Sequence, residues 1–200
     1  MTASNDGPAS RLLAQNLEEW RTLASALPEL SAQAERAASY IADSFAAGGT
    51  LFACGNGGSA ADAAHLTTEL VIRFKKERKG LPAVCLNAHG GDLTAAGNDY
   101  EFARVFARQL ESLGRPGDVL VAFSTSGSSA NVNEAVSTAI DRGMRVVSMI
   151  GKGGGTQAGI TADGQAVNLI VPSDSTARVQ EAHTVLLHTL VEAVEELLGL

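Results

Sequence analysis

The chain has 200 residues, the length of one ordinary domain with room for a substantial core. Its formal net charge of -7 and its scattered lysines exclude the clustered basic surface of a nucleic-acid-binding protein. No apolar run approaches the roughly 20 residues of a membrane span, and the polar start MTASNDGPAS lacks a signal-peptide core. The two cysteines, Cys54 and Cys85, stand in apolar runs, so we expect a cytoplasmic protein with reduced thiols.

Two helical patterns open the chain. After about eight residues that we expect to be mobile, leucines recur at helical spacing from Leu12 to Leu27, and Pro28 interrupts the pattern. A second apolar pattern runs from Ala34 to Phe45 and stops before a pair of glycines. The sequence therefore predicts a pair of N-terminal helices over residues 9–47.

From residue 50 onward, strand patterns and helix patterns alternate. The strand candidates are continuous apolar runs, which indicates that both faces of the sheet are covered. Strands are predicted at 50–54, 83–86, 119–123, 146–150 and 167–171. Helices are predicted at 59–75, 100–113, 130–142 and 175–198, and the basic residues 75–79 are interpreted as the solvated end of the first of these. The alternation is typical of an α/β fold with a doubly wound parallel sheet, and we expect residues 50–200 to form its core within one domain, 1–200.

Three loops rich in glycine or serine follow predicted strands, at residues 55–59, 124–129 and 151–155. The carboxyl ends of parallel strands meet at one edge of the sheet, where α/β proteins bind their ligands. The three loops are therefore expected to lie together at that edge and to form a binding site.

The first loop, GNGGSA at residues 55–60, joins a strand to a helix. Its glycines allow backbone N–H groups to approach an anion at the helix N-terminus, which predicts a phosphate site. The loop also fits the dinucleotide fingerprint, with alanine in the third glycine position. That fingerprint requires an acidic residue at the end of the next strand, and this strand ends Leu86-Asn87-Ala88. We therefore expect no nicotinamide or flavin cofactor.

The second loop, STSGSS at residues 124–129, carries five hydroxyl groups in six positions before a helix. Helix capping would explain one or two of them. We favour a cradle in which hydroxyl and backbone N–H groups bind a phosphate without a fixed cation. Such a cradle suits a phosphosugar that must be released.

Histidines and carboxylates stand on two of the predicted helices. His65 and Glu69 are four residues apart and share a helix face, where they could hold a metal or move a proton. On the last helix, Gln180 and His183 lie within one turn, and His188 is about 80° around the helix from Gln180. Apolar residues surround all of these positions, so histidines that simply pack in the core are the alternative interpretation.

The four motifs together resemble those of one family. GNGGSAADAAH…E, GND at residues 97–99, STSGSSAN at 124–131 and RVQEAHTVLLH at 178–188 occur in this order over nearly the whole chain. The chain resembles the phosphoheptose isomerases, single-domain sugar isomerase (SIS) proteins that act on sedoheptulose 7-phosphate. The resemblance implies a three-layer, flavodoxin-like SIS domain with a five-stranded parallel sheet. Ala177 departs from some members, which have aspartate at this position.

The resemblance also implies roles for individual residues. Glu69 and His188 would be the acid–base pair that interconverts ketose and aldose through a cis-enediol. One zinc ion per subunit would be held by His65, Glu69, Gln180 and His188, while His183 would have a supporting role. Substrate-binding residues would be Asn56, Gly57, Gly58, Ser59, Glu69, Asn98, Asp99, Ser124, Thr125, Ser126, Ser129 and Gln180.

Other readings of the same motifs remain open. Some SIS relatives are tetrameric adaptors that bind the replication initiator DnaA, and such relatives can lack the second histidine of the last motif, which is present here as His188. An isomerase of another phosphosugar is a further alternative, because loops that recognise phosphate and hydroxyl groups do not reveal the length of the sugar. The family also implies a homotetramer, in which the N-terminal helices and the last helix pack between subunits.

Overall fold

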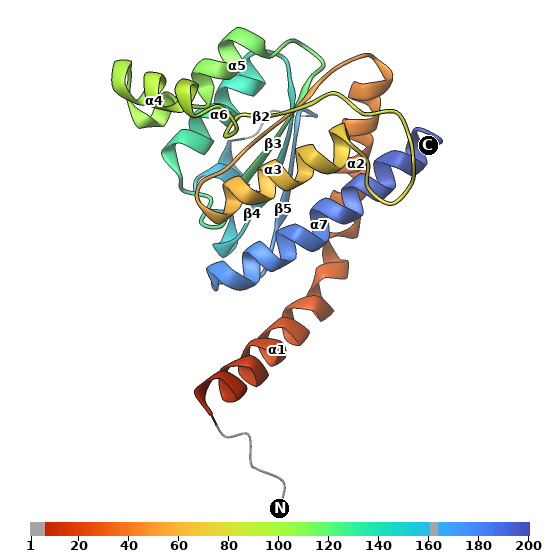
Figure 1. Ribbon diagram of the computed structural model, residues 1–200, viewed down its shortest axis with the longest axis vertical. Coiled ribbons are helices and arrows are strands. Elements are labelled where there is room, and N and C mark those ends of the chain that lie inside the picture. The colour runs from red at the N-terminus through yellow and green to blue at the C-terminus, as the bar shows by residue number, and fades with distance from the viewer. Residues whose placement is uncertain (1–6, 161–163) are drawn as a thin grey trace, which may run out of the picture.

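The computed structural model describes residues 7–160 and 164–200. Helices and strands alternate after a long N-terminal helix (Figure 1). In chain order they are α1 (Pro8–Ala26), the 3-10 turn η1 (Leu27–Leu30), α2 (Ser31–Ala46), β1 (Leu51–Cys54), α3 (Gly58–Val71), β2 (Ala83–Cys85), α4 (Gly90–Asp99), η2 (Phe102–Arg104), α5 (Ala107–Leu113), β3 (Val119–Ser124), α6 (Ala130–Asp141), β4 (Arg145–Ile150), η3 (Lys152–Gly154), η4 (Gln157–Gly159), β5 (Ala166–Ile170) and α7 (Thr176–Leu197).

The five strands form one parallel sheet in the order β2-β1-β3-β4-β5. This is the flavodoxin-like order, in which the direction of winding reverses beside β1. The predicted α/β class and its five-stranded parallel sheet are therefore confirmed. The loops after β1 and β3 flank the reversal point, where this architecture binds ligands.

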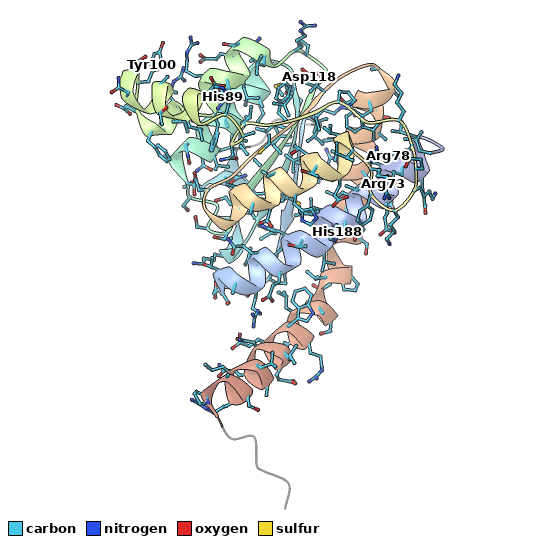
Figure 2. All side chains as sticks on the ribbon, viewed as in Figure 1. Arg73, Arg78, His89, Tyr100, Asp118 and His188 are labelled. Atoms are coloured by element: carbon cyan, nitrogen blue, oxygen red, sulfur yellow. The ribbon has the colours of Figure 1, made fainter. Side chains whose placement is uncertain are left out.

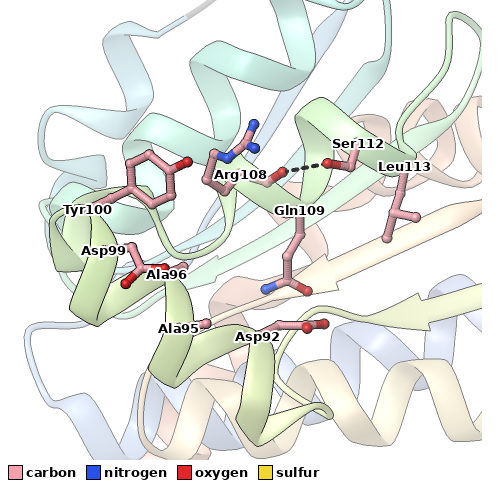
Figure 3. Close-up of a pocket in the computed structure, with 9 residues that line it drawn as sticks. All are labelled: Asp92, Ala95, Ala96, Asp99, Tyr100, Arg108, Gln109, Ser112 and Leu113. Atoms are coloured by element: carbon pink, nitrogen blue, oxygen red, sulfur yellow. Dashed lines mark hydrogen bonds between the residues drawn. The ribbon is translucent and has the colours of Figure 1, made fainter.

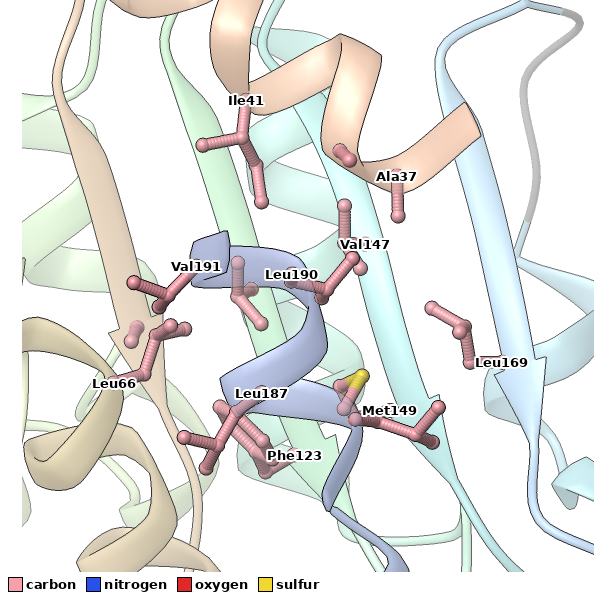
Figure 4. Packing of buried hydrophobic residues seen from close by; sticks show 14 of the residues in the cluster. Ala37, Ile41, Leu66, Phe123, Val147, Met149, Leu169, Leu187, Leu190 and Val191 are labelled. Carbon is pink, nitrogen blue, oxygen red and sulfur yellow. The ribbon is translucent and has the colours of Figure 1, made fainter. Parts of the chain in front are cut away.

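Helices cover both faces of the sheet and create two apolar clusters. Along β1, Leu51 and Ala53 face α2, α3 and α7, whereas Phe52 and Cys54 face α5 and α6. Figure 4 shows the first cluster, in which α7 lies across the middle strands and Leu187 and Leu190 contact the side chains that rise from the sheet. Because α3 and α7 are held by the same cluster, their relative position is set by the core.

Helix α1 extends away from the other elements (Figure 1). Leu23 is its only buried residue, whereas Leu12, Leu13 and Leu17 are 47%, 60% and 52% exposed. The helix thus carries an apolar stripe with no partner in the described part of this chain. No helix of that part is both long and apolar enough to cross a membrane.

Several predicted boundaries were wrong. Helix α1 begins at Pro8, one residue before the predicted start at residue 9, and residues 1–6 of the segment expected to be mobile lie outside the described part. Helix α4 was missed because three glycines in ten residues weaken its helical signal; the His89 side chain caps it by accepting a hydrogen bond from the Asp92 backbone. The predicted helix 100–113 is divided into η2 and α5.

Helix α3 was predicted to reach residue 75 but ends at Val71. The carbonyl of Leu70 accepts hydrogen bonds from the Leu81 backbone N–H at 2.9 Å and from the Arg78 guanidinium at 2.9 Å. These tertiary contacts replace the next helical turn. The basic residues 75–79 therefore belong to the loop that leads to β2 and do not form a helix end.

Candidate active site

Helices α3 and α7 lie side by side and run in the same direction (Figure 1). Residues of α3 contact residues of α7 that lie a nearly constant number of positions later in the sequence. Asp62 accepts a hydrogen bond from Thr184, 122 positions later, and His65 meets His188, 123 positions later. The facing sides of the two helices therefore bring four of the predicted polar residues, and Asp62, onto one strip of the molecule.

His65, Glu69 and His188 form a compact group on this strip. The Nε2 atom of His65 lies 3.1 Å from Oε1 of Glu69 and 3.2 Å from Nε2 of His188. The two imidazole rings meet edge to face, with centroids 4.8 Å apart. One donor atom from each residue falls within 4.8 Å of the others, so the group could hold a metal ion. Imidazole nitrogen and carboxylate oxygen are donors that zinc accepts.

The environment of His188 favours its neutral imidazole. Burial, and next the neighbouring His65, lower the pKa of His188 below its usual value. The side chains of His65 and Glu69 are 38% and 19% exposed, so the group is open to a small molecule from solvent. A carboxylate beside a neutral histidine is a set that can move protons at neutral pH.

The glycine loop after β1 turns into α3 at Gly57. Gly57 has a φ of 57° immediately before α3, a conformation that favours glycine. The Asn56 side chain exchanges two hydrogen bonds with that of Asn131, at 2.8 and 2.9 Å, which ties this loop to the start of α6. Ser59 is buried in the first turn of α3. The backbone N–H groups of Ser59 and Ala60 donate to the carbonyls of Asn56 and Gly57 at 3.0 and 3.1 Å, and the positive end of the helix dipole at this start is suited to an anion.

The serine loop after β3 is organised by its own hydroxyl groups. The Ser124 hydroxyl accepts a hydrogen bond from the Gly127 backbone at 3.1 Å, and Ser126 accepts one from the Ser128 backbone at 3.2 Å. Ser129 precedes α6 without capping it through its side chain. Thr125 occupies the same turn. Capping therefore does not account for the cluster of hydroxyls.

The third loop, after β4, packs against the backbone of the serine loop. A Cβ atom on Gly127 would lie 2.0 Å from the Gly154 carbonyl oxygen, and one on Gly151 would lie 2.6 Å from that of Thr125. The backbone N–H of Gln157 also donates to the Gly127 carbonyl at 2.8 Å. The glycines here allow two loops to pack backbone against backbone.

Asn98 and Asp99 are not brought to the His65 group. They end α4, which belongs to the opposite helical layer, and the Asn98 amide donates to the Asp99 carboxylate at 2.8 Å. Asp99 lines a cavity of about 310 Å³ between α4 and α5, together with Tyr100 and Arg108 (Figure 3). Among the described residues, no hydrogen bond or ion pair joins Asn98 or Asp99 to either loop or to the histidines.

Gln180 and His183 occupy different surroundings on α7. The Gln180 amide lies against Gly58, where an added Cβ would be 2.3 Å from its Nε2 atom, so it stands at the glycine loop. Eight residues, about 12 Å along a helix, separate it from His188. His183 is fully buried beside Phe123, and burial lowers its pKa to about 4. His183 therefore packs in the core as a neutral side chain.

Sequence reasoning did not single out Asp62, Asn87 or Asn131. Asp62 is buried between α3 and α7, and this burial raises its pKa to about 6. Asn87 exchanges hydrogen bonds with the Gly55 backbone at 3.2 and 2.9 Å, and so joins the end of β2 to the glycine loop. The spacing of Asp62 from His65 and Glu69, three and seven residues, could have indicated the shared face.

Comparison with known proteins finds the same architecture over nearly the whole chain. The family model described as the SIS domain matches residues 17–151. A phosphoheptose isomerase of Alkalilimnicola ehrlichii is 44% identical over 189 residues, covering 94% of this chain and 96% of the relative. The solved phosphoheptose isomerase of Neisseria gonorrhoeae is 39% identical with a TM-score of 0.88, covering 94% and 99% of the two chains. That of Francisella tularensis is 31% identical with a TM-score of 0.91, covering 95% and 100%.

Proposed function

The chain belongs to the phosphoheptose isomerase family of SIS-domain proteins, which are aldose–ketose isomerases, and we propose that it converts sedoheptulose 7-phosphate into D-glycero-D-manno-heptose 7-phosphate. The observation that carries this proposal is the meeting of His65, Glu69 and His188 between α3 and α7. A set of two imidazoles and one carboxylate supports proton transfer between adjacent carbon and oxygen atoms.

The distance from the glycine loop to the histidines supports a long substrate. Seven residues of α3 separate Gly58 from His65, about 10 Å at 1.5 Å per residue. This is comparable with the length of an extended seven-carbon sugar phosphate. We expect the phosphate at the helix N-terminus, with Asn56, Gly57, Ser59 and the hydroxyls of Ser124, Thr125, Ser126 and Ser129, and carbons 1 and 2 beside Glu69.

In the proposed mechanism, Glu69 moves the carbon-bound proton. Its carboxylate removes a proton from C1 of the ketose and returns it to C2, through a cis-enediol. His188 is neutral because of its burial and its neighbour His65. It moves the hydroxyl proton between the oxygens on C1 and C2 of the sugar. His65, Glu69 and His188 would hold the zinc ion. Gln180, whose amide lies against Gly58 in this structure, would have to turn toward the histidines to act as a fourth donor. When bound, zinc would supply Lewis acidity toward the substrate oxygens.

Incubation with sedoheptulose 7-phosphate, with and without zinc, tests this function. We expect the aldose signals to grow in NMR spectra with the wild-type chain and not with His188→Gln. Absence of conversion under every metal condition would contradict the proposal and favour a non-catalytic SIS adaptor, for which a pull-down of protein partners is the next measurement.

We also propose a homotetramer, which the apolar stripe of α1 supports. Leu12, Leu13 and Leu17 are large exposed residues on a helix that leaves the rest of the chain. We expect sedimentation at micromolar concentration to report four subunits, and the double variant Leu13→Glu/Leu17→Glu to dissociate. A wild-type monomer at that concentration would contradict the assembly.

Contact of Asn98 and Asp99 with the sugar stays a prediction. A tetramer would allow a second subunit to complete the pocket.

A further inference from the structure

Residues 72–80, here called the crossing segment, leave α3, pass over α7 and lead to β2 (Figure 2). Two ion pairs attach the segment to α7. Lys75 contacts Glu192 at 2.5 Å, and Arg78 contacts Glu195 at 2.7 Å. The segment has no regular secondary structure; besides these ion pairs, Phe74 packs against the first apolar cluster.

The crossing segment carries an aromatic ring onto the proposed acid–base histidine. Phe74 stacks on His188 with ring centroids 5.0 Å apart and an interplanar angle of 17°. His188 is therefore held between Phe74 on one face and the edge contact with His65. In this arrangement the Nε2 atom of His188 faces His65, at 3.2 Å.

Arg78 is the buried anchor of the crossing segment. Its side chain is 2% exposed and that of Glu195 is 4% exposed. Besides the ion pair, the guanidinium donates to the backbone carbonyls of Leu70 at 2.9 Å and Glu69 at 2.7 Å. One planar group thus joins the crossing segment, the end of α3 and the face of α7. A lysine has no fork that could reach all three acceptors.

We propose that Arg78 is a positioning residue for the isomerisation, because it holds the crossing segment so that Phe74 keeps the His188 ring directed at Glu69. This inference rests on the proposed function for its kinetic consequence only. The structural part concerns the chain without metal or substrate. The other side chain on this path, Phe74, acts through His188 and does not itself exchange protons.

NMR of the metal-free, substrate-free chain tests the structural part. Stacking on Phe74 changes the chemical shift of the His188 ring protons through the ring current of Phe74. The Phe74→Leu variant removes this ring-current shift and so identifies it in the spectrum. We expect Arg78→Lys to lose this shift as well, while Phe74→Tyr keeps it. A matched control is Arg145→Lys, which alters an arginine–carboxylate contact of 2.8 Å to Asp43, outside α3, α7 and the crossing segment.

Loss of one partner of a buried ion pair can unfold a protein, so a second variant separates folding from positioning. In Arg78→Met/Glu195→Met both charges are absent, and such apolar pairs often preserve stability. We expect this variant to fold but to lack the His188 ring-current shift. If the shift survives in both the lysine and the double variant, Arg78 does not position Phe74 and the inference is wrong.

Kinetics then test the consequence. We expect Arg78→Lys and Phe74→Leu to lower kcat by about 10-fold to 100-fold, the usual cost of a misplaced reacting group. KM should change little in both variants, because the glycine and serine loops are untouched. The Phe74→Tyr variant, which keeps an aromatic ring at this position, should have the wild-type kcat. An unchanged kcat together with a lost shift would contradict the catalytic importance of the stack. A wild-type chain without isomerase activity would instead contradict the proposed function and leave the NMR result to be judged alone.

Discussion

The Glu69→Gln variant is expected to lose the isomerisation of sedoheptulose 7-phosphate while it keeps its fold. Glutamine has the shape of glutamate and its amide oxygen still reaches His65, which lies 3.1 Å from the carboxylate. It cannot accept a proton from carbon, so kcat should fall by about 10³-fold, within the range for removal of a general base. The aldose signal in NMR spectra measures the rate.

A matched variant separates this effect from general loss of a glutamate. Glu134 is a surface residue of α6 that pairs with Arg104 at 2.8 Å. Glu134→Gln removes a paired carboxylate away from α3 and α7 and should leave kcat unchanged. A Glu69→Gln enzyme with the wild-type rate would show that another group is the base.

Removal of zinc is expected to have the second large effect. Exhaustive chelation should lower the rate more than 10-fold, and addition of one equivalent of zinc per subunit should restore it. The set of donors contains one carboxylate and, in Gln180, a neutral amide that zinc rarely uses, so the ion should be held with moderate affinity and leave under chelation. Metal content and rate should be measured on the same samples.

Two histidine variants make the metal prediction specific. His65→Gln removes a donor of the three-residue group and should weaken zinc binding in a titration, independently of activity. His89→Gln alters an exposed histidine beside Asp92 at the start of α4 and should leave zinc binding unchanged. Full activity of a chain that contains no metal after chelation would contradict the assignment of a metal to this site.

Most of the fold could be predicted from the sequence, because short local patterns indicate its helices and strands. Continuous apolar runs predicted all five strands to within two residues at each end. The central strands β1, β3 and β4 are buried on both faces and need no polar alternation, whereas the edge strands β2 and β5 are partly exposed. Glycine-rich α4 escaped detection because its helix depends on the His89 cap and on packing more than on propensity. The end of α3 could not be located either, because Arg78 and Leu81 determine it from outside the helix.

The same distinction applies to the candidate site. His65 and Glu69 could be paired from sequence because four residues bring side chains onto one helix face, and the glycine and serine loops were recognised from composition. The 3.2 Å contact of His65 with His188 spans 123 positions and exists only because the core holds α3 and α7 in parallel. By itself the sequence determined which elements form and which loops bear polar groups, because backbone geometry and burial act over a few residues. Only the tertiary structure decided which helices face one another, how Phe74 reaches His188, and that α4 lies in the other layer, because those contacts depend on the packing of distant segments.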